Sequence, residues 1–472
     1  MNNKLERVQI VGLHGNKTVD VQLSDNTLIL VGENGSGKTT ILRILFDFLS
    51  GRWLSLREFQ FDYVSATIDG EEHKVTRQEL IKKNPESYRQ FLSGLPAPIR
   101  YRVSDLLDAG RFDDIPNELK KMYNRYGYSI SRDELESALM NYSVIYNSLF
   151  IEEKPDGPKK DLRKSIQRVR DAIDAQILYL PTYRRIEREL DSIFEGLDID
   201  DYRRQKSMRQ RHRMTDMSNE KAEAYIELVE FGMKDVQVAI DRTLTHLKEF
   251  SRENLNALTV QYLGDVVSEA YLNVVMSEIY NVPETTVLAA LNRIDERILG
   301  SDHKDHLLEV IHSAGSEKSP TDHSKIISHY FLKLLKFQES LQEEEEKISR
   351  FCALCSEYIV DKQFVYDSAN FSFSIVPKDK NNTVSIELQD LSSGEKQIVS
   401  IFSHLYLSRM TNFFVLIDEP ELSLSVPWQR RFLVDIKNGD FCAGLVAVTH
   451  SPFIYENDLR KYAHSVGEFV ST

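Results

Sequence analysis

The stretch from Gly32 to Thr39 constrains this chain more than any other part of its sequence; it reads Gly-Glu-Asn-Gly-Ser-Gly-Lys-Thr. It matches the pattern G-x-x-x-x-G-K-[ST] at every position. An apolar run, 28–31, precedes it, and apolar residues at helical spacing follow it in 41–49. A strand, a glycine-rich loop and a helix in this order form a cradle for a polyphosphate, because the loop amides and the helix N-terminus face it. The stretch therefore predicts a nucleoside triphosphate site in an α/β protein.

Each residue of this loop has an expected task. Glycines let the backbone approach the phosphates, Lys38 adds a positive charge beside them, and the Thr39 hydroxyl can ligate Mg²⁺. We therefore count Lys38 among the candidate catalytic residues and Thr39 among the candidate metal ligands. The residues expected to contact the nucleotide are Asn34, Gly35, Ser36, Gly37, Lys38, Thr39 and Thr40.

Strand-rich and helix-rich segments alternate along the 472 residues, a length that favours more than one domain. Two hairpins, the second with an Asp69-Gly70 turn, are predicted before residue 77. We predict five segments: a strand-rich part with the phosphate loop in 1–76, a helical insertion in 77–176, a strand with an arginine-rich end in 177–187, a helical or coiled-coil insertion in 188–359, and a second strand-containing part in 360–472.

Long amphipathic helices are predicted in the middle of the chain. Apolar residues recur at steps of three and four in 229–247, and a second helix is predicted in 255–266. A heptad pattern runs through 327–355 and is broken at Glu344. Two interpretations of this pattern stay open: a short coiled coil or helical hairpin, and one face of a compact helical domain.

Charge and hydropathy exclude several classes of protein. The formal net charge of −14 argues against a protein that coats nucleic acid. A local basic stretch, Arg203 to Arg213, could still bind nucleic acid or an acidic partner; the alternative is a solvated loop. The sequence has no apolar run long enough to span a membrane, and its start lacks the apolar core of a signal peptide. We expect no membrane partner and a cytoplasmic location.

Three further segments carry chemistry after the helical middle. The segment Leu391-Ser-Ser-Gly-Glu opens an apolar helix and places serines at its N-cap. An unbroken apolar strand then ends in Asp418 and Glu419, and a second one ends in His450. Polar side chains at the ends of buried strands are typical of ligand sites in α/β proteins.

The phosphate loop, the L-S-S-G-E signature, the D-E-terminated strand and the strand-terminal histidine, in this order, resemble the ATP-binding-cassette ATPases. The resemblance implies an ABC-type P-loop ATPase head, made of a β-lobe and a RecA-like parallel-sheet lobe and split here by the long helical insertion. It implies that the chain hydrolyses ATP to ADP and phosphate with Mg²⁺. It also implies that Asp418 holds Mg²⁺, that Glu419 activates the attacking water and that His450 contacts the γ-phosphate.

The same resemblance implies an assembly. Ser392, Ser393 and Gly394 would contact the γ-phosphate of a nucleotide that another subunit holds, so hydrolysis would need a head-to-tail pair of heads. We therefore expect a homo-oligomer, at least a dimer and open to higher order. For Glu395, a signature role and a capping-box role both stay open.

The spacing narrows the type of cassette. About 350 residues separate Thr39 from Leu391, whereas these elements lie much closer together in transporter cassettes. This layout resembles the SMC and RecF group, and D-E-P-E-L-S-L-S with T-H-S-P is most similar to the OLD-like ATPases. In many of those relatives the position of Ser425 is a histidine, so roles there do not carry over. The sequence ends soon after His450 and leaves no room for a Toprim nuclease, so we expect no nuclease activity in this chain itself.

Two functions follow from the resemblance. Similar stand-alone ATPases act in the Septu and PARIS anti-phage defence systems, and Septu pairs its ATPase with an HNH nuclease. The first expectation is therefore an ATP-driven switch or scaffold that controls a separate effector, of the HNH nuclease type, in anti-phage defence. The alternative is a RecF-like or SMC-like ATPase that clamps DNA in repair or recombination, using the helical insertion and the stretch from Arg203 to Arg213. A transporter cassette is disfavoured by the split head.

Overall fold

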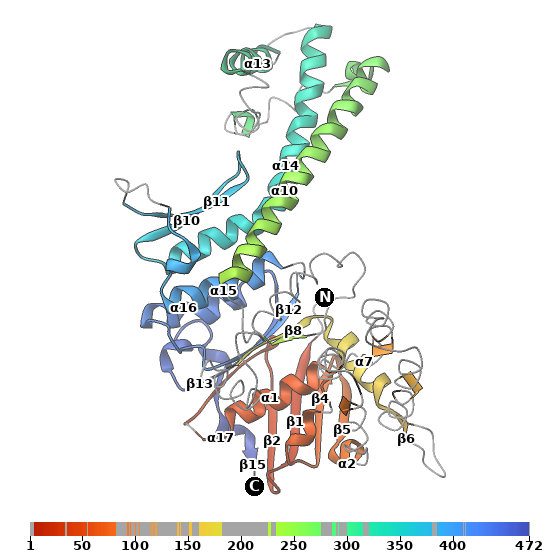
Figure 1. Cartoon of the computed structure of the whole chain (residues 1–472), viewed down its shortest axis with the longest axis vertical. Coiled ribbons are helices and arrows are strands. Elements are labelled where there is room, and N and C mark those ends of the chain that lie inside the picture. Colours follow the sequence, from red (N-terminus) through yellow and green to blue (C-terminus); the bar gives the residue numbers. More distant parts are fainter. Residues whose placement is uncertain are drawn as a thin grey trace. The chain divides into compact units, whose positions relative to one another are not determined.

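The chain forms two units in this computed structural model (Figure 1). The first unit combines both ends of the sequence, Met1–Glu230 and Met410–Thr472, and the second is the continuous stretch Phe231–Arg409. The residues that the structure describes are 4–33, 35–53, 55–81, 160–181, 225–227, 233–274, 300–314, 321–379, 385–408, 410 and 412–471, with isolated positions between 92 and 152 and between 286 and 291.

An antiparallel sheet forms one layer of the first unit, in the strand order β15-β2-β1-β4-β5. Its strands are β1 (Leu5–Leu13), β2 (Lys17–Gln22), β4 (Tyr63–Ile68), β5 (Glu71–Thr76) and β15 (Val470–Ser471). Val8 pairs with Val21 across β1 and β2, and both side chains are buried, so one face of the sheet is apolar. Asp69 and Gly70 both have positive φ, at 49° and 79°, as a two-residue hairpin turn requires. The two predicted hairpins are confirmed.

A six-stranded parallel sheet forms the other layer, in the order β14-β3-β13-β12-β8-β9. Its strands are β3 (Thr27–Val31), β8 (Gln176–Leu180), β9 (Tyr225–Glu227), β12 (Phe413–Asp418), β13 (Cys442–Thr449) and β14 (Ala463–Ser465). The apolar runs that predicted β3, β12 and β13 follow from burial on both faces of a parallel sheet. The predicted α/β class, with a β-lobe and a parallel-sheet lobe, is confirmed.

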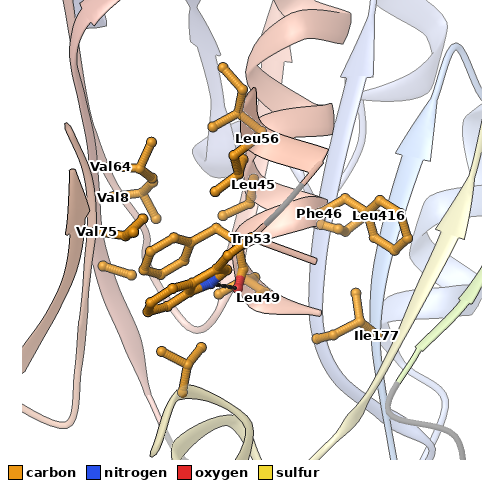
Figure 2. Close-up of a cluster of buried hydrophobic side chains, with 14 of the residues drawn as sticks. Val8, Leu45, Phe46, Leu49, Trp53, Leu56, Val64, Val75, Ile177 and Leu416 are labelled. Atoms are coloured by element: carbon orange, nitrogen blue, oxygen red, sulfur yellow. Dashed lines mark hydrogen bonds between the residues drawn. The ribbon is translucent and has the colours of Figure 1, made fainter. Parts of the chain in front are cut away.

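The helix that follows the phosphate loop, α1 (Lys38–Leu49), fills the space between the two sheets (Figure 2). Phe46 stacks on Tyr179 of β8 with ring centres 4.7 Å apart, and Phe48 stacks on Trp53 at 5.3 Å. Figure 2 shows that α1 lies between side chains of the antiparallel sheet and of the parallel sheet, among them Val8, Val64, Val75, Ile177 and Leu416. Packing on both sides fixes the helix, and with it the loop that opens it.

Shorter elements also belong to the described part of the first unit. They are η1 (Ser55–Glu58), α2 (Arg77–Ile81), β6 (Ile151–Glu152), β7 (Lys160–Asp161), α7 (Leu162–Ile173), α16 (Val426–Lys437), η5 (Pro452–Ile454), η6 (Arg460–Tyr462) and α17 (Val466–Phe469). Arg170 of α7 donates to the carbonyl of Ser50 at 3.0 Å, directly after α1. A cation at the C-terminal end of α1 stabilises that end of the helix.

Two long helices, α10 (Met233–Val267) and α14 (Asp322–Tyr358), pack along each other in the second unit (Figure 1). Asp265 of α10 accepts from His329 at 2.8 Å and pairs with Lys333 at 2.6 Å, both on α14. The prediction of two helices in 229–266 was wrong, because no glycine or proline interrupts α10 between them. Among the described residues, no helix is long and apolar enough to cross a membrane.

Other elements in the described part of the second unit are η3 (Ala270–Asn273), α13 (Ser301–Ala314), β10 (Lys362–Asp367), β11 (Ser372–Pro377), η4 (Leu388–Asp390) and α15 (Ser393–Leu407). Helix α14 also contacts α13, η3, β10 and α15, while η4 contacts α10 and β11 pairs with β10. Leu341 and Ile348 of the predicted heptad pattern are buried. Glu344, where the predicted heptad pattern is broken, is exposed, whereas the next residue, Glu345, is buried and accepts a hydrogen bond from the Tyr366 hydroxyl at 2.7 Å. Since α14 packs on β10 and α15 as well as on α10, its buried strip is wider than a coiled-coil seam.

Candidate functional site

The phosphate loop joins β3 to α1 at the carboxyl end of the parallel sheet. Gly35 and Gly37 have φ of 84° and 91°, a conformation that favours glycine. A Cβ added at either position would meet no atom within 4 Å, so the backbone conformation and not crowding calls for glycine there. The Ser36 amide donates to the Glu33 carbonyl at 3.2 Å, and Asn34 lies outside the described residues. The open space beside the two glycines fits the phosphate cradle that the sequence predicts.

Lys38 is the first residue of α1, and only 5% of it is exposed. Its ammonium group donates to the carbonyls of Gly32 at 2.6 Å and Glu33 at 2.9 Å. These bonds hold the charge inside the loop, where a buried ammonium needs acceptors. An ammonium has three donors, so one remains for a phosphate oxygen. Thr40, in the same helical turn, is half-buried.

Thr39 and Asp418 meet although 379 residues separate them in the sequence. The Thr39 hydroxyl donates to the Asp418 carboxylate at 3.0 Å, from the first turn of α1 to the last residue of β12. A hydroxyl and a carboxylate are oxygen ligands of the kind that Mg²⁺ prefers. The two residues that the sequence assigns to the metal therefore lie together, and their donor set fits this ion.

Glu419 directly follows β12 and has a positive φ of 50°, a conformation that is uncommon for residues other than glycine. Burial raises the pKa of its carboxyl group, and the charges of Asp418 and Glu421 raise it further. His450 and Lys38 act in the opposite direction on this pKa. A carboxylate whose pKa is raised by its surroundings binds a proton more readily, as a general base must.

Glu421 is a residue that the sequence analysis did not single out. It is 7% exposed, and its carboxylate accepts from the Thr449 hydroxyl at 2.8 Å and from the His450 amide at 3.0 Å. The His450 imidazole Nδ1 lies 2.9 Å from the same carboxylate. The signal in the sequence that could have pointed to Glu421 was its place as the last acidic residue of the D-E-P-E segment.

Gln429, in the first turn of α16, adds a second connection in the same region. Its side-chain amide donates to the Leu424 carbonyl at 2.9 Å, and its side-chain oxygen accepts from the Ser451 hydroxyl at 2.8 Å. Hydrogen bonds therefore connect the turn after β12 to the segment after β13 at His450 itself, through Glu421, and at the next residue, Ser451, through Gln429.

The signature segment begins α15 in the second unit. Ser392 is the N-cap; its hydroxyl accepts from the Glu395 amide at 3.4 Å, and the Glu395 carboxylate accepts from the Ser392 amide at 2.7 Å. Of the two roles left open for Glu395, the capping box is thus observed. Burial acts to raise the pKa of Glu395, but the Ser392 amide and Lys362, at 3.1 Å, outweigh it and lower this pKa. Ser392 and Ser393 are exposed and Gly394 is buried.

The structure brings together some of the predicted site residues. Lys38, Thr39, Asp418, Glu419 and His450 all belong to the first unit and lie at the carboxyl ends of its parallel strands. The signature serines belong to the second unit. The basic stretch 203–213 lies outside the described residues. The chemical roles assigned to all these residues stay predictions.

Comparison with known proteins gives one family and two similar structures. A model of the AAA ATPase domain family matches residues 4–455. The Smc head domain of Pyrococcus furiosus, with an extended coiled coil and bound to the C-terminal domain of ScpA, is 11% identical, with 96% of this chain and 91% of that chain covered and a TM-score of 0.35. The Smc head domain of Pyrococcus yayanosii, with a coiled coil and joint, is 12% identical, with 96% and 93% covered and a TM-score of 0.28. No curated protein matches.

Proposed function

Since this chain belongs to the AAA ATPase domain family, we propose that it binds ATP at the carboxyl edge of its parallel sheet and hydrolyses it there. The observation that carries this proposal is the contact between Thr39 and Asp418, with Glu419 next to it in the chain. A phosphate loop alone would indicate nucleotide binding. A hydroxyl and a carboxylate whose donor set fits Mg²⁺, next to a carboxylate with a raised pKa, support the proposal of turnover.

The residues would divide the work as follows. The loop amides and Lys38 would hold the phosphates, and Thr39 and Asp418 would hold Mg²⁺, which when bound neutralises charge on the phosphates. Glu419 would orient a water molecule and take its proton as the water attacks. His450 would donate a hydrogen bond to the γ-phosphate. Phosphoryl transfer depends mostly on positioning and charge stabilisation, and these groups would supply the part of both that one head contributes.

Glu419→Gln tests this assignment. The variant should bind ATP as the wild type does, because the phosphate loop is intact, and lose turnover by about 100-fold or more, because an amide cannot accept the proton. ATP binding is measured by equilibrium dialysis and turnover by phosphate release. Glu456→Gln changes an exposed glutamate of the same unit and is the matched control. Turnover at the wild-type rate in Glu419→Gln would show that the assignment is wrong.

For the biological role, we propose an ATP-driven switch or scaffold that assembles with copies of itself and controls a separate effector in anti-phage defence. The proposal rests on the order of the site residues, which resembles that of stand-alone defence ATPases, and on the exposed signature serines, which are accessible to another subunit. The effector class we propose is an HNH nuclease. Affinity purification from the native host tests the proposal, and the expected result is a nuclease bound in the same complex. Purification of the ATPase without any nuclease would contradict it.

A DNA-clamping ATPase is the second candidate, and the long packed pair of α10 and α14 favours it, because paired long helices can reach around a duplex. Such a clamp must neutralise phosphates with lysines and arginines, so its affinity for duplex DNA must fall steeply as salt rises. Binding is measured by fluorescence anisotropy over a salt series, for the wild type and for a variant with the arginines of 203–213 replaced by alanine. Absence of salt-dependent binding would exclude the clamp.

A further inference from the structure

Glu421 is buried, and its carboxylate accepts from Thr449, which ends the neighbouring strand β13, and from His450, which follows that strand. We propose that Glu421 is a positioning residue that holds the His450 imidazole toward the γ-phosphate. This inference rests on the proposed ATPase function. It assigns a task to a side chain that touches neither the nucleotide nor the water.

The hydrogen-bond chemistry determines which edge of the imidazole faces the nucleotide. An ionised carboxylate can only accept, so the Nδ1 that lies 2.9 Å from Glu421 must carry the proton of that bond. The other ring nitrogen, Nε2, is then the one left to face a phosphate, and it donates there in the imidazolium form, in which both ring nitrogens carry a proton. The His450 side chain is 46% exposed, so its outer edge is within reach of a ligand while its inner edge is held.

Glu421 is itself held rigidly, as a positioning residue must be. Its carbonyl accepts from the Leu424 amide at 3.1 Å and closes a turn directly after β12. Gln429 clamps the same turn through Leu424 and, at its other end, binds Ser451, the residue after His450. Glu421 therefore holds the ring and the backbone amide of His450, and Gln429 holds the next residue, Ser451. A side chain fixed in this way loses little freedom when the nucleotide binds.

A purely structural role is the competing explanation, because the bond from Thr449 to Glu421 also joins the ends of two strands. The two roles predict different results. If the contacts of Glu421 only stabilise the fold, their loss should lower kcat by the same factor whether or not His450 is present. A positioning bond acts through His450, so its loss should have no further effect once the imidazole is gone.

The experiment compares Glu421→Ala, Glu421→Gln, His450→Ala and the double variant Glu421→Ala/His450→Ala in the full chain. We expect Glu421→Ala to lower kcat about 100-fold, as misplacement of a group in an active site does, with KM for ATP changed by less than about threefold. Glu421→Gln should recover kcat to within about tenfold of the wild type, because its amide oxygen still accepts from Nδ1. The double variant should turn over ATP at the rate of His450→Ala when both are assayed above the acid limb of kcat/KM, where the Glu421 charge does not change the fraction of ionised Glu419.

Destabilisation is controlled separately, because Glu421→Ala removes a buried group. Asp47→Asn changes another buried carboxylate of the same unit, far along α1 from the loop, and should lower the melting temperature with kcat within about twofold of the wild type. Wild-type kcat in Glu421→Ala would overturn the positioning role alone. So would a double variant whose kcat is lower than that of His450→Ala by the same factor that separates Glu421→Ala from the wild type. Wild-type kcat in His450→Ala would overturn both this inference and the proposed part of His450 in hydrolysis.

Discussion

The pKa of Glu419 responds to burial and to four neighbouring side chains, and this setting decides the pH range in which Glu419 can act as a base. Burial and the charges of Asp418 and Glu421 raise its pKa in the free protein. A base works only in its deprotonated form, so kcat/KM should be full above this raised pKa and fall as the pH drops through it. The fall should begin at a higher pH than for an ordinary glutamate, whose pKa is about 4.3.

Replacing one of the neighbouring charges tests this explanation. Glu421→Gln removes a negative charge that raises the pKa of Glu419, so the acid limb of kcat/KM should move to lower pH. The measurement is phosphate release at low ATP concentration across the pH range in which the protein stays folded. The control, Glu456→Gln, lies at an exposed position and should leave the limb in place. An acid limb that does not move in Glu421→Gln would show that the neighbouring carboxylate does not set this pKa.

Single residues differ in how far the sequence could predict them. Lys38, Thr39, Asp418 and Glu419 each lie in a local pattern with a known physical task, a glycine-rich loop or the end of an apolar strand. Glu421 does not, because its partner Thr449 comes 28 residues later in the chain. Its importance depends on β12 and β13 lying side by side in register, and the alternation of residues within either strand carries no information about that pairing.

At the scale of elements, α14 shows that a heptad count can predict a helix without predicting the full width of its buried strip. The count assumes a repeat of about 3.5 residues facing a single partner, whereas a straight helix drifts by about 20° in each heptad. Because α14 packs on β10 and α15 in addition to α10, the buried strip includes Glu345 and not Glu344. Spacing could not predict this, because the second partner comes from a later part of the chain.

The contact between Glu345 and Tyr366 should be important for the second unit. Tyr366→Phe removes a donor to a buried carboxylate, so we expect the free energy of unfolding to fall by about 1–3 kcal/mol. Glu345→Gln in the same background should recover part of this loss, since a neutral amide is less costly to bury. Chemical denaturation measures both, with Glu344→Gln at the exposed neighbour as control. Unchanged stability in Tyr366→Phe would contradict the prediction.

Two glycines in regular elements should respond to alanine with opposite signs. In β13, a Cβ at Gly444 would lie 2.3 Å from the Phe414 ring, so Gly444→Ala should cost about 1–3 kcal/mol through overpacking. In α10, a Cβ at Gly264 would meet no atom within 4 Å, so Gly264→Ala should stabilise the helix by about 0.5–1 kcal/mol. Thermal unfolding of the two variants checks both values. Equal effects would show that space around the Cβ does not decide the outcome.

At the scale of the whole molecule, the parallel sheet combines strands from both ends of the chain. Strand β3 comes from the N-terminal part and pairs with β13 from the C-terminal part, so the phosphate loop reaches Asp418 only when the two ends meet. Apolar strands recurring after residue 360 made this meeting predictable. The grouping of α15 with α10 and α14 was not predictable, because it depends on packing that no local pattern encodes. The five predicted segments stay predictions.

The proposed assembly makes a prediction that needs two copies of the chain. If the signature serines of one copy serve the nucleotide held by another, a chain with Lys38→Ala and a chain with Ser393→Arg should each be inactive alone. The first cannot hold its own nucleotide, and the second cannot serve its partner's. In a mixed dimer, the phosphate loop of the second chain meets the intact signature of the first, which restores one of the two sites. Random pairing should then return about a quarter of the wild-type activity in an equimolar mixture.

The measurement is phosphate release after the two purified variants are mixed, incubated to exchange subunits and supplied with Mg²⁺ and ATP. Two controls fix the interpretation. Each variant mixed with an inactive Lys38→Ala/Ser393→Arg chain should stay inactive, because no pair then combines an intact loop with an intact signature. Light scattering of Glu419→Gln with ATP should detect a larger species than without ATP, since blocked turnover keeps the heads together. A mixture as inactive as its parts, although subunits exchange, would show that each chain hydrolyses ATP without its neighbour's signature.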